Sequence, residues 1–144
     1  MSPATALAPI AAEARPKVKR AFEVAITPDP VRVAHIRRII SAYMRFWGVP
    51  TSPADDVVLA VSELVTNGVE HGRGDVDLRV RHTGVELCVD VIDENPAPAR
   101  LRTAEAHDVC GRGLFLVSVL AHAWGVSNNG RTTWATFRIV DGRP

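Results

Sequence analysis

Glu-Leu-Val-Thr-Asn-Gly-Val-Glu-His, residues 63–71, is the stretch of this chain that says most about its fold. It lies in a longer segment whose apolar residues recur at the i, i+3, i+4 and i+7 spacing of one helix face. The residues of this stripe are Val57, Val58, Val61, Leu64, Val65 and Val69. The pattern predicts an amphipathic helix whose apolar face packs on a core.

Two polar residues on this predicted helix form a chemically distinctive pair. Glu63 and Asn67 are four positions apart, so their side chains point the same way, one turn apart. A carboxylate beside a carboxamide oxygen suits Mg²⁺, which keeps several waters and bridges to substrate phosphates. The simpler alternative is that both are ordinary exposed residues of the helix surface.

The bulk properties of the chain are those of one ordinary globular domain. It has 144 residues, of which 47% are hydrophobic and 23% are charged, and its formal net charge is +1. This balance gives no general electrostatic reason to bind nucleic acid or a membrane surface. We find no apolar run long enough to span a bilayer and no secretory signal pattern. Cys88 and Cys110 make no metal-ligand pattern, which predicts reduced thiols in a cytoplasmic protein.

The N-terminal region predicts a tail followed by a strand. Residues 1–17 are rich in Ala and Pro and lack periodicity, so they predict a flexible tail. The folded domain is then expected over residues 18–142. Residues 20–26 alternate apolar and polar side chains, as a half-buried strand does.

Two helices are expected next. Asp29 can cap a helix that has Pro30 at its first position and runs to about Trp47. Ser52 can cap a second helix, with Pro53 at the first position, that ends near His71.

The second half of the chain predicts two hairpins and a third helix. Strands are expected at residues 76–82 and 85–93, joined through Thr83-Gly84, and again at 124–127 and 132–140. Residues 94–110 show no period, and a loop of that length in a compact domain is usually functional or mobile. Residues 113–123 predict a helix that is apolar on most sides and therefore well buried. This order predicts an α+β fold of two layers, with a mixed, mostly antiparallel sheet and its helices on one face.

Three separate segments carry the chemistry that a phosphate ligand needs. One is the Glu63/Asn67 helix face, one is Asp93 at a strand end, and one is Gly111-Arg112-Gly113-Leu114 at a helix start. The free N–H groups of a helix N-terminus, with the helix dipole behind them, bind phosphate, and glycine lets the backbone approach closely. Taken singly, however, a strand-end carboxylate is usually a turn former, and paired glycines can serve tight backbone geometry alone.

The ordered set of motifs resembles the GHKL (Bergerat-fold) ATPases over about residues 20–140. Within that family it resembles the small anti-sigma-factor serine/threonine kinases of actinomycetes. The residues that carry the resemblance are Glu63-Leu64-Val65-Thr66-Asn67 with His71 (N box), Val91-Ile92-Asp93, Gly111-Arg112-Gly113-Leu114 (second glycine box) and Arg131-Thr132-Thr133-Trp134-Ala135-Thr136-Phe137 (last hairpin).

The resemblance implies ATP and Mg²⁺ as cofactors and assigns a role to each motif. The implied roles are Glu63 as general base, Asn67 as Mg²⁺ ligand, Asp93 as the residue that binds the adenine amino group, Gly111, Arg112 and Gly113 with Leu114 as the phosphate-binding turn, Thr132 or Thr133 beside adenine, and residues 94–110 as the ATP lid. The implied partners are a sigma factor, an anti-anti-sigma antagonist or both, with neither nucleic acid nor membrane. Related kinases often form homodimers.

The sequence departs from the family pattern at the first glycine box. The family has Asp-x-Gly-x-Gly, and this chain has Asp93-Glu94-Asn95-Pro96-Ala97, without either glycine. A second departure is Gly68, where the family usually has Ala after the Asn.

Three functions follow. The first is an anti-sigma factor that phosphorylates Ser or Thr of an antagonist protein. The second is a non-catalytic partner-binding module with a degenerate ATP site. The third, ranked lowest, is the catalytic domain of a histidine kinase.

Overall fold

The structure, a computed structural model, describes residues 17–71, 74–93, 111–127 and 129–139. The elements follow the predicted order of strand, two helices, two strands, helix and two strands. They are β1 (Arg20–Ile26), α2 (Pro30–Phe46), α3 (Thr51–His71), β2 (Val76–His82), β3 (Glu86–Ile92), α5 (Gly111–Leu120), β4 (Ala123–Ser127) and β5 (Thr132–Arg138). The predicted tail, the 94–110 loop, the altered glycine box after Asp93 and Cys110 lie outside the described residues.

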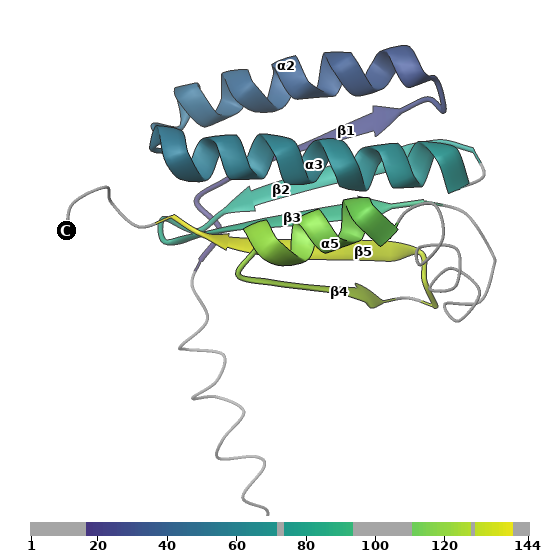
Figure 1. Cartoon of the computed structure of the whole chain (residues 1–144). Coiled ribbons are helices and arrows are strands. Elements are labelled where there is room, and N and C mark those ends of the chain that lie inside the picture. Colours follow the sequence, from purple (N-terminus) through teal and green to yellow (C-terminus); the bar gives the residue numbers. More distant parts are fainter. Residues whose placement is uncertain (1–16, 72–73, 94–110, 128, 140–144) are drawn as a thin grey trace, which may run out of the picture.

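The strands form one five-stranded sheet in the order β1-β2-β3-β5-β4. Each neighbouring pair is antiparallel, so among the described strands the sheet is wholly antiparallel rather than mixed. Figure 1 shows α2, α3 and α5 as one layer over a single face of this sheet. The two-layer α+β fold with helices on one face is therefore confirmed.

Alternation along the strands separates an apolar face from a polar one. On β2, Leu78 and Val80 are fully buried under the helices, whereas Arg79 lies on the helix-free face and pairs with Glu23. The same face holds the ion pair between Arg81 of β2 and Asp90 of β3, at 2.9 Å, and the half-buried free thiol of Cys88 on β3. Burial, together with the charge of Glu86, raises the pKa of that thiol. The core therefore lies between the layers, and the other face of the sheet is polar.

The first long helix begins and ends as predicted. The Val31 N–H donates to Asp29 Oδ1 at 3.0 Å, and Pro30 stands at the first helical position, where a missing N–H costs nothing. The helix ends at Phe46, Trp47 is its C-cap residue, and Gly48 follows with φ of +72°. That left-handed conformation is one that glycine adopts without steric cost.

The second helix begins earlier than predicted. It starts at Thr51, so Ser52 lies inside the first turn and is not the cap. Pro53 is tolerated there because the first-turn N–H groups have no acceptor within the helix. Near the other end of α3, a Cβ built on Gly68 would lie 3.2 Å from both methyl groups of Val76 and 3.4 Å from a methyl of Val91. Glycine at this position lets the helix approach the sheet closely.

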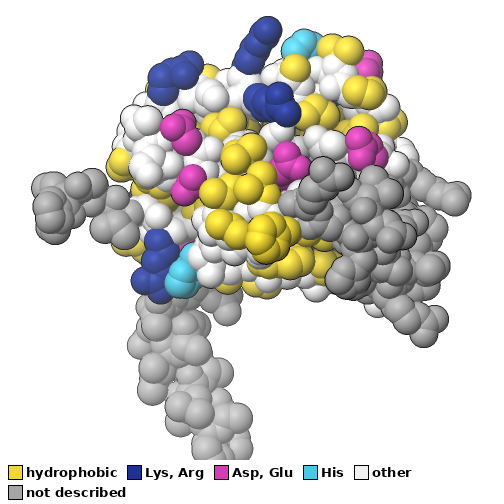
Figure 2. Space-filling view, in the orientation of Figure 1, with side chains coloured by type: hydrophobic (Ala, Val, Ile, Leu, Met, Phe, Trp, Pro, Cys, Tyr) yellow, Lys and Arg dark blue, Asp and Glu magenta, His cyan; other side chains and the backbone are white. Residues whose placement is uncertain are grey.

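The third helix differs most from its prediction. It begins two residues earlier than predicted, at Gly111, and ends at Leu120, and Ala123 already belongs to β4. Val117 is fully buried, but Phe115 is 69% exposed and Val119 is 62% exposed, so the expected burial on most sides is wrong. The reason is its place at the margin of the helix layer, with α3 on one flank only (Figure 1). Figure 2 shows apolar side chains gathered on the surface in this region.

Both hairpin turns use the backbone freedom predicted for them. Gly84 has φ of +103° in the β2–β3 turn, where Thr83 Oγ1 accepts the Glu86 N–H at 3.1 Å. Asn129 and Gly130 both have positive φ in the β4–β5 turn. None of the helices in the described part of the chain is long and apolar enough to cross a bilayer.

Candidate functional site: the α3–α5 junction

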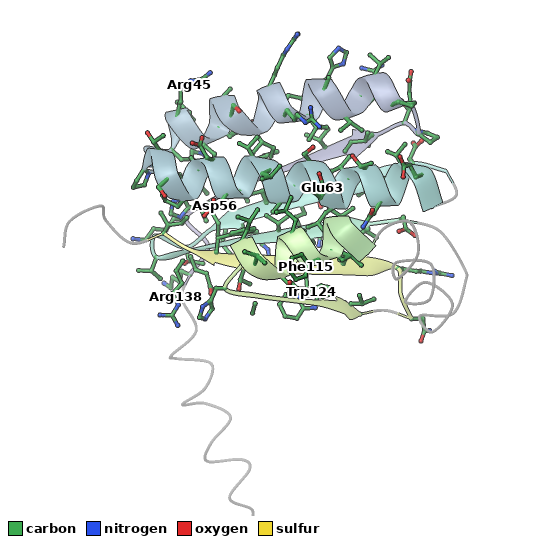
Figure 3. The ribbon with its side chains drawn as sticks, viewed as in Figure 1. Arg45, Asp56, Glu63, Phe115, Trp124 and Arg138 are labelled. Carbon is green, nitrogen blue, oxygen red and sulfur yellow. The ribbon has the colours of Figure 1, made fainter. Side chains whose placement is uncertain are left out.

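The first turn of α5 lies directly against the polar face of α3. A Cβ built on Gly113 would stand 2.8 Å from Glu63 Oε1 and 3.8 Å from Asn67 Oδ1. A side chain at position 113 would force the Glu63 carboxylate to move, because real Cβ atoms do not approach other atoms to 2.8 Å. The structure thus brings two of the three sequence-predicted segments together. Figure 3 labels Glu63 on α3 and Phe115 on the adjoining helix α5.

The N-terminal turn of α5 supplies the electrostatic complement to these oxygens. Gly111 and Arg112 form the start of the helix, so the free N–H groups of its first turn lie next to Glu63 and Asn67. Such a helix end carries a partial positive charge and favours an anion. A site with anion-binding N–H groups on one side and cation-binding oxygens on the other suits a metal-bound phosphate.

Asp93 is the third predicted element, and it lies at the end of β3. Asp93 is 2% exposed, and its N–H donates to the Arg131 carbonyl at 2.9 Å. Val91, two positions earlier on the same face of the strand, lies under Gly68 of α3. The buried carboxylate therefore continues the line of the strand beneath the C-terminal part of the helix that carries Asn67.

The sheet register separates the two threonines of the last hairpin. Thr133 pairs with Val91 and Thr132 pairs with Ile92. Because side chains alternate along a strand, Thr133 shares the helix-covered face with Val91, and Thr132 belongs to the opposite face. The side chain nearer to Asp93 on the helix-covered face is thus that of Thr133.

The predicted residues that flank this junction hold its backbone in place. Leu114 is partly buried and packs against the core, which fixes the first turn of α5 on α3. His71 is the last residue of α3, as the sequence predicted. The described residues include no group of three or more His, Cys, Asp or Glu side chains arranged to hold a metal ion.

A polar anchor on the other flank of α3 was missed by sequence reasoning. Ser62 is 1% exposed, and its hydroxyl accepts a hydrogen bond from Arg37 Nε of α2 at 2.8 Å. Thr66 Oγ1 donates to the Ser62 carbonyl at 2.7 Å. Arg37 thereby links α2 to α3 next to Glu63. The only signal in the sequence was a serine within an apolar helical stripe.

The atoms at this junction fit the ligand that the motifs imply. The amide oxygen of Asn67 is a hard ligand of the kind Mg²⁺ accepts, and Mg²⁺ takes its remaining ligands from phosphates and water. The glycine at position 113 lets the first turn of α5 approach Glu63 and Asn67 closely, and helix N-termini are sites that favour phosphate oxygens.

Comparisons with known proteins agree with this geometry. Residues 26–138 match the model of the histidine kinase-like ATPase domain. No curated protein matches the chain. Among solved structures, the crystal structure of the RsbU and RsbW domains of Rv1364c from Mycobacterium tuberculosis is similar, with 19% sequence identity and a TM-score of 0.62. The match covers 83% of this chain and 32% of that chain, so this chain spans about a third of its length. At that identity the likeness supports the fold. The match over residues 26–138 shows that the chain belongs to the histidine kinase-like ATPase domain family, an ATP-binding family.

Proposed function

We propose that this protein is an Mg·ATP-dependent serine/threonine kinase of the anti-sigma-factor type, which phosphorylates a small antagonist protein. The observation that carries the proposal is the contact of Gly113 with Glu63 and Asn67, which makes one site from two distant motifs. The similarity to a structure with an RsbW domain is in keeping with this class. The proposed partners are a sigma factor and an anti-anti-sigma antagonist, and the proposed location is the cytoplasm.

Each motif has one task in the proposed site. Asn67 binds Mg²⁺ through its amide oxygen, and the first turn of α5, with Gly111, Arg112 and Gly113, binds phosphate oxygens. Asp93 accepts a hydrogen bond from the adenine amino group, and Thr133 lies on the same face of the sheet. The nucleotide domain is residues 18–142.

Glu63 is the proposed general base. Its carboxylate lies one helical turn from Asn67 and against Gly113, so it borders the same space as the phosphate-binding turn. Mg·ATP supplies the phosphoryl group and the cation that neutralises its charge. The carboxylate of Glu63 accepts the proton of the attacking Ser or Thr hydroxyl, and a positioned base contributes roughly 10²–10⁴-fold to such a rate.

The decisive experiment is phosphoryl transfer from labelled ATP to a cognate antagonist protein. Glu63→Gln keeps the size of the side chain and removes its basicity, so we expect transfer to fall at least about 100-fold with ATP binding retained. Asp55→Asn, on the exposed part of the same helix, is the matched control and should transfer like the wild type. Transfer by Glu63→Gln at the wild-type rate would remove Glu63 from this role, and absence of transfer by the wild type would remove the kinase activity.

The second candidate function is a partner-binding module without catalysis. The observation that favours it is the sequence Glu94-Asn95-Pro96-Ala97, where the related kinases have glycines. In that case ATP binding would be weak or absent while a sigma factor still bound. Calorimetry with ATP and Mg²⁺ separates the two, because an absence of heat together with tight partner binding favours the module.

A further inference from the structure

A polar cavity lies at the opposite end of the sheet from Asp93. Its volume is about 270 Å³, and its walls include Lys19, Arg20, Trp47, His82 and Gly84. The β2–β3 register fixes its position, because His82 pairs with Leu87 at one end of the hairpin and Asp77 pairs with Ile92 at the other. This cavity is therefore remote from the α3–α5 junction.

Two cationic side chains of the N-terminal region meet at this cavity. Arg20 is the register partner of His82 and shares the helix-covered face with it, and the Lys19 N–H donates to the His82 carbonyl at 2.8 Å. A Cβ built on Gly84 would lie 3.2 Å from Lys19 Nζ, so the bare glycine makes room for the ammonium group. Among the described residues that line the cavity none is acidic, so the positive charge is not balanced within its walls.

His82 adds a directional donor. His82 is 8% exposed, and its Nδ1 accepts a hydrogen bond from the Gly84 N–H at 2.8 Å. The proton of the neutral ring is therefore on Nε2, which has no hydrogen-bond partner among the described residues. Trp47 packs edge-on against the ring, with centroids 5.7 Å apart, and holds its orientation. Burial, and then the charges of Arg20 and Lys19, lower the pKa of His82, which keeps the ring neutral near pH 7.

We propose that this cavity binds a phosphate group, either as the free ion or as a monoester. A guanidinium, an ammonium and an imidazole N–H around one space are the donors that bind phosphate oxygens through charge-assisted hydrogen bonds. A tetrahedral oxyanion can accept from all three at once. The site is separate from the nucleotide site, and it stands whether or not the proposed kinase activity does.

The test is an NMR titration of the full-length protein with inorganic phosphate at constant ionic strength, set by chloride. We expect saturable shifts of the Gly84 amide and of the Trp47 indole N–H. Arg20→Gln should weaken phosphate binding about tenfold, the equivalent of one charge-assisted hydrogen bond. Arg138→Gln is the matched control: it removes the same charge at the same end of the sheet but on its helix-free face, so affinity should not change.

Two further arms identify the ligand and the donor. Titration with O-phosphoserine is compared with titration with inorganic phosphate. The compound with the lower Kd shows whether the cavity prefers a monoester or the free ion. Sulfate, which does not titrate in this range, should bind more tightly at pH 6 than at pH 8, because a bound anion favours the protonated imidazole beside Arg20 and Lys19. His82→Gln should abolish this pH dependence.

Three results would overturn the proposal. One is a linear shift with phosphate that chloride reproduces, and another is equal binding by Arg20→Gln and Arg138→Gln. The third is saturable shifts confined to the first turn of α5. Asn67→Ala, which disables the proposed nucleotide site, should leave phosphate binding at Gly84 unchanged, so the two proposals fail separately.

Discussion

The two flanks of helix α3 differ in what holds them. Toward α2 the contact is apolar and buried, with Ile36, Ile40 and Met44 from that helix in the core. Toward α5, Gly113 in the first turn of that helix lies against the carboxylate of Glu63 and the amide of Asn67. Phe115 and Val119 on the outer side of α5 remain exposed. The comparison teaches that one flank of the helix stabilises the fold, whereas the other carries the polar side chains of the proposed nucleotide site.

This division has a physical basis in burial. Apolar area removed from water contributes roughly 25 cal/mol per Å², and Ile36, Ile40 and Met44 on the α2 flank lie in the buried core. Polar groups at a site must stay accessible to a ligand, so they add little to stability. The Arg37–Ser62 hydrogen bond is a polar link between α2 and α3, and it lies next to Glu63.

The largest expected effect tests the stabilising flank. Ile40 is fully buried, so Ile40→Ala should lower the free energy of unfolding by about 2–5 kcal/mol, from lost burial and the cavity left behind. Urea denaturation measures the change. Val31→Ala, at a position that is 60% exposed on the same helix, is the control and should change stability by less than about 0.5 kcal/mol. Equal effects of the two substitutions would contradict the assignment of the α2 flank to stability.

The next effect tests the other flank. Gly113→Ala places a methyl group 2.8 Å from Glu63 Oε1, so that carboxylate must move. We expect ATP affinity to fall about tenfold, equal to 1.4 kcal/mol. Stability should change by no more than about 1 kcal/mol, because alanine also favours the helix. Val119→Ala, on the exposed face of α5, should bind ATP as the wild type does, and a stability loss in Gly113→Ala without an affinity loss would break the comparison.

A smaller effect is expected where α3 meets the sheet. Gly68→Ala gains about 1 kcal/mol of helix propensity, but its methyl would press on the buried methyl groups of Val76. Crowding of this kind costs roughly 1–3 kcal/mol, so we expect a net destabilisation of about 1 kcal/mol. The double variant with Val76→Ala tests the cause, since relief of crowding should make the two changes non-additive. Additive effects would show that crowding is not the reason for this glycine.

The smallest effect concerns pH at the end of α2, where Trp47 packs on His82. Because the pKa of His82 is lowered in the folded state, the unfolded chain binds more protons near the ordinary His pKa of 6.5. Stability from this residue is therefore present above pH 6.5 and is lost as pH falls below it. Denaturation at pH 7.5 and 5.5 should show a smaller loss in His82→Gln than in the wild type.

The sequence predicted the elements well where local chemistry decides them. Asp29-Pro30 marked the start of α2, and the alternation of residues 76–82 marked a strand that is buried on one face. The sequence predicted burial less well where packing against other elements determines it. Residues 113–123 have apolar side chains all round, but only packing against α3 shows that Phe115 stays outside.

The candidate site was predictable as a set of motifs and not as a geometry. The spacing of Glu63 and Asn67 placed both on one helix face, but their contact with Gly113 spans about fifty residues of chain and depends on how α5 packs. The choice between Thr132 and Thr133 needed the β3–β5 register, which the sequence does not contain. Likewise, nothing local to His82 revealed the charges of Lys19 and Arg20 beside it.

Calorimetric titration of the full-length protein and of Asn67→Ala with ATP, each with and without Mg²⁺, tests the central claim most directly. The claim is that the polar face of α3 and the first turn of α5 form one metal-nucleotide site. The account predicts that Mg²⁺ strengthens ATP binding by the wild type and that Asn67→Ala, with an unchanged thermal unfolding midpoint, loses this increase. Mg²⁺-dependent ATP binding of equal strength in both proteins would contradict it.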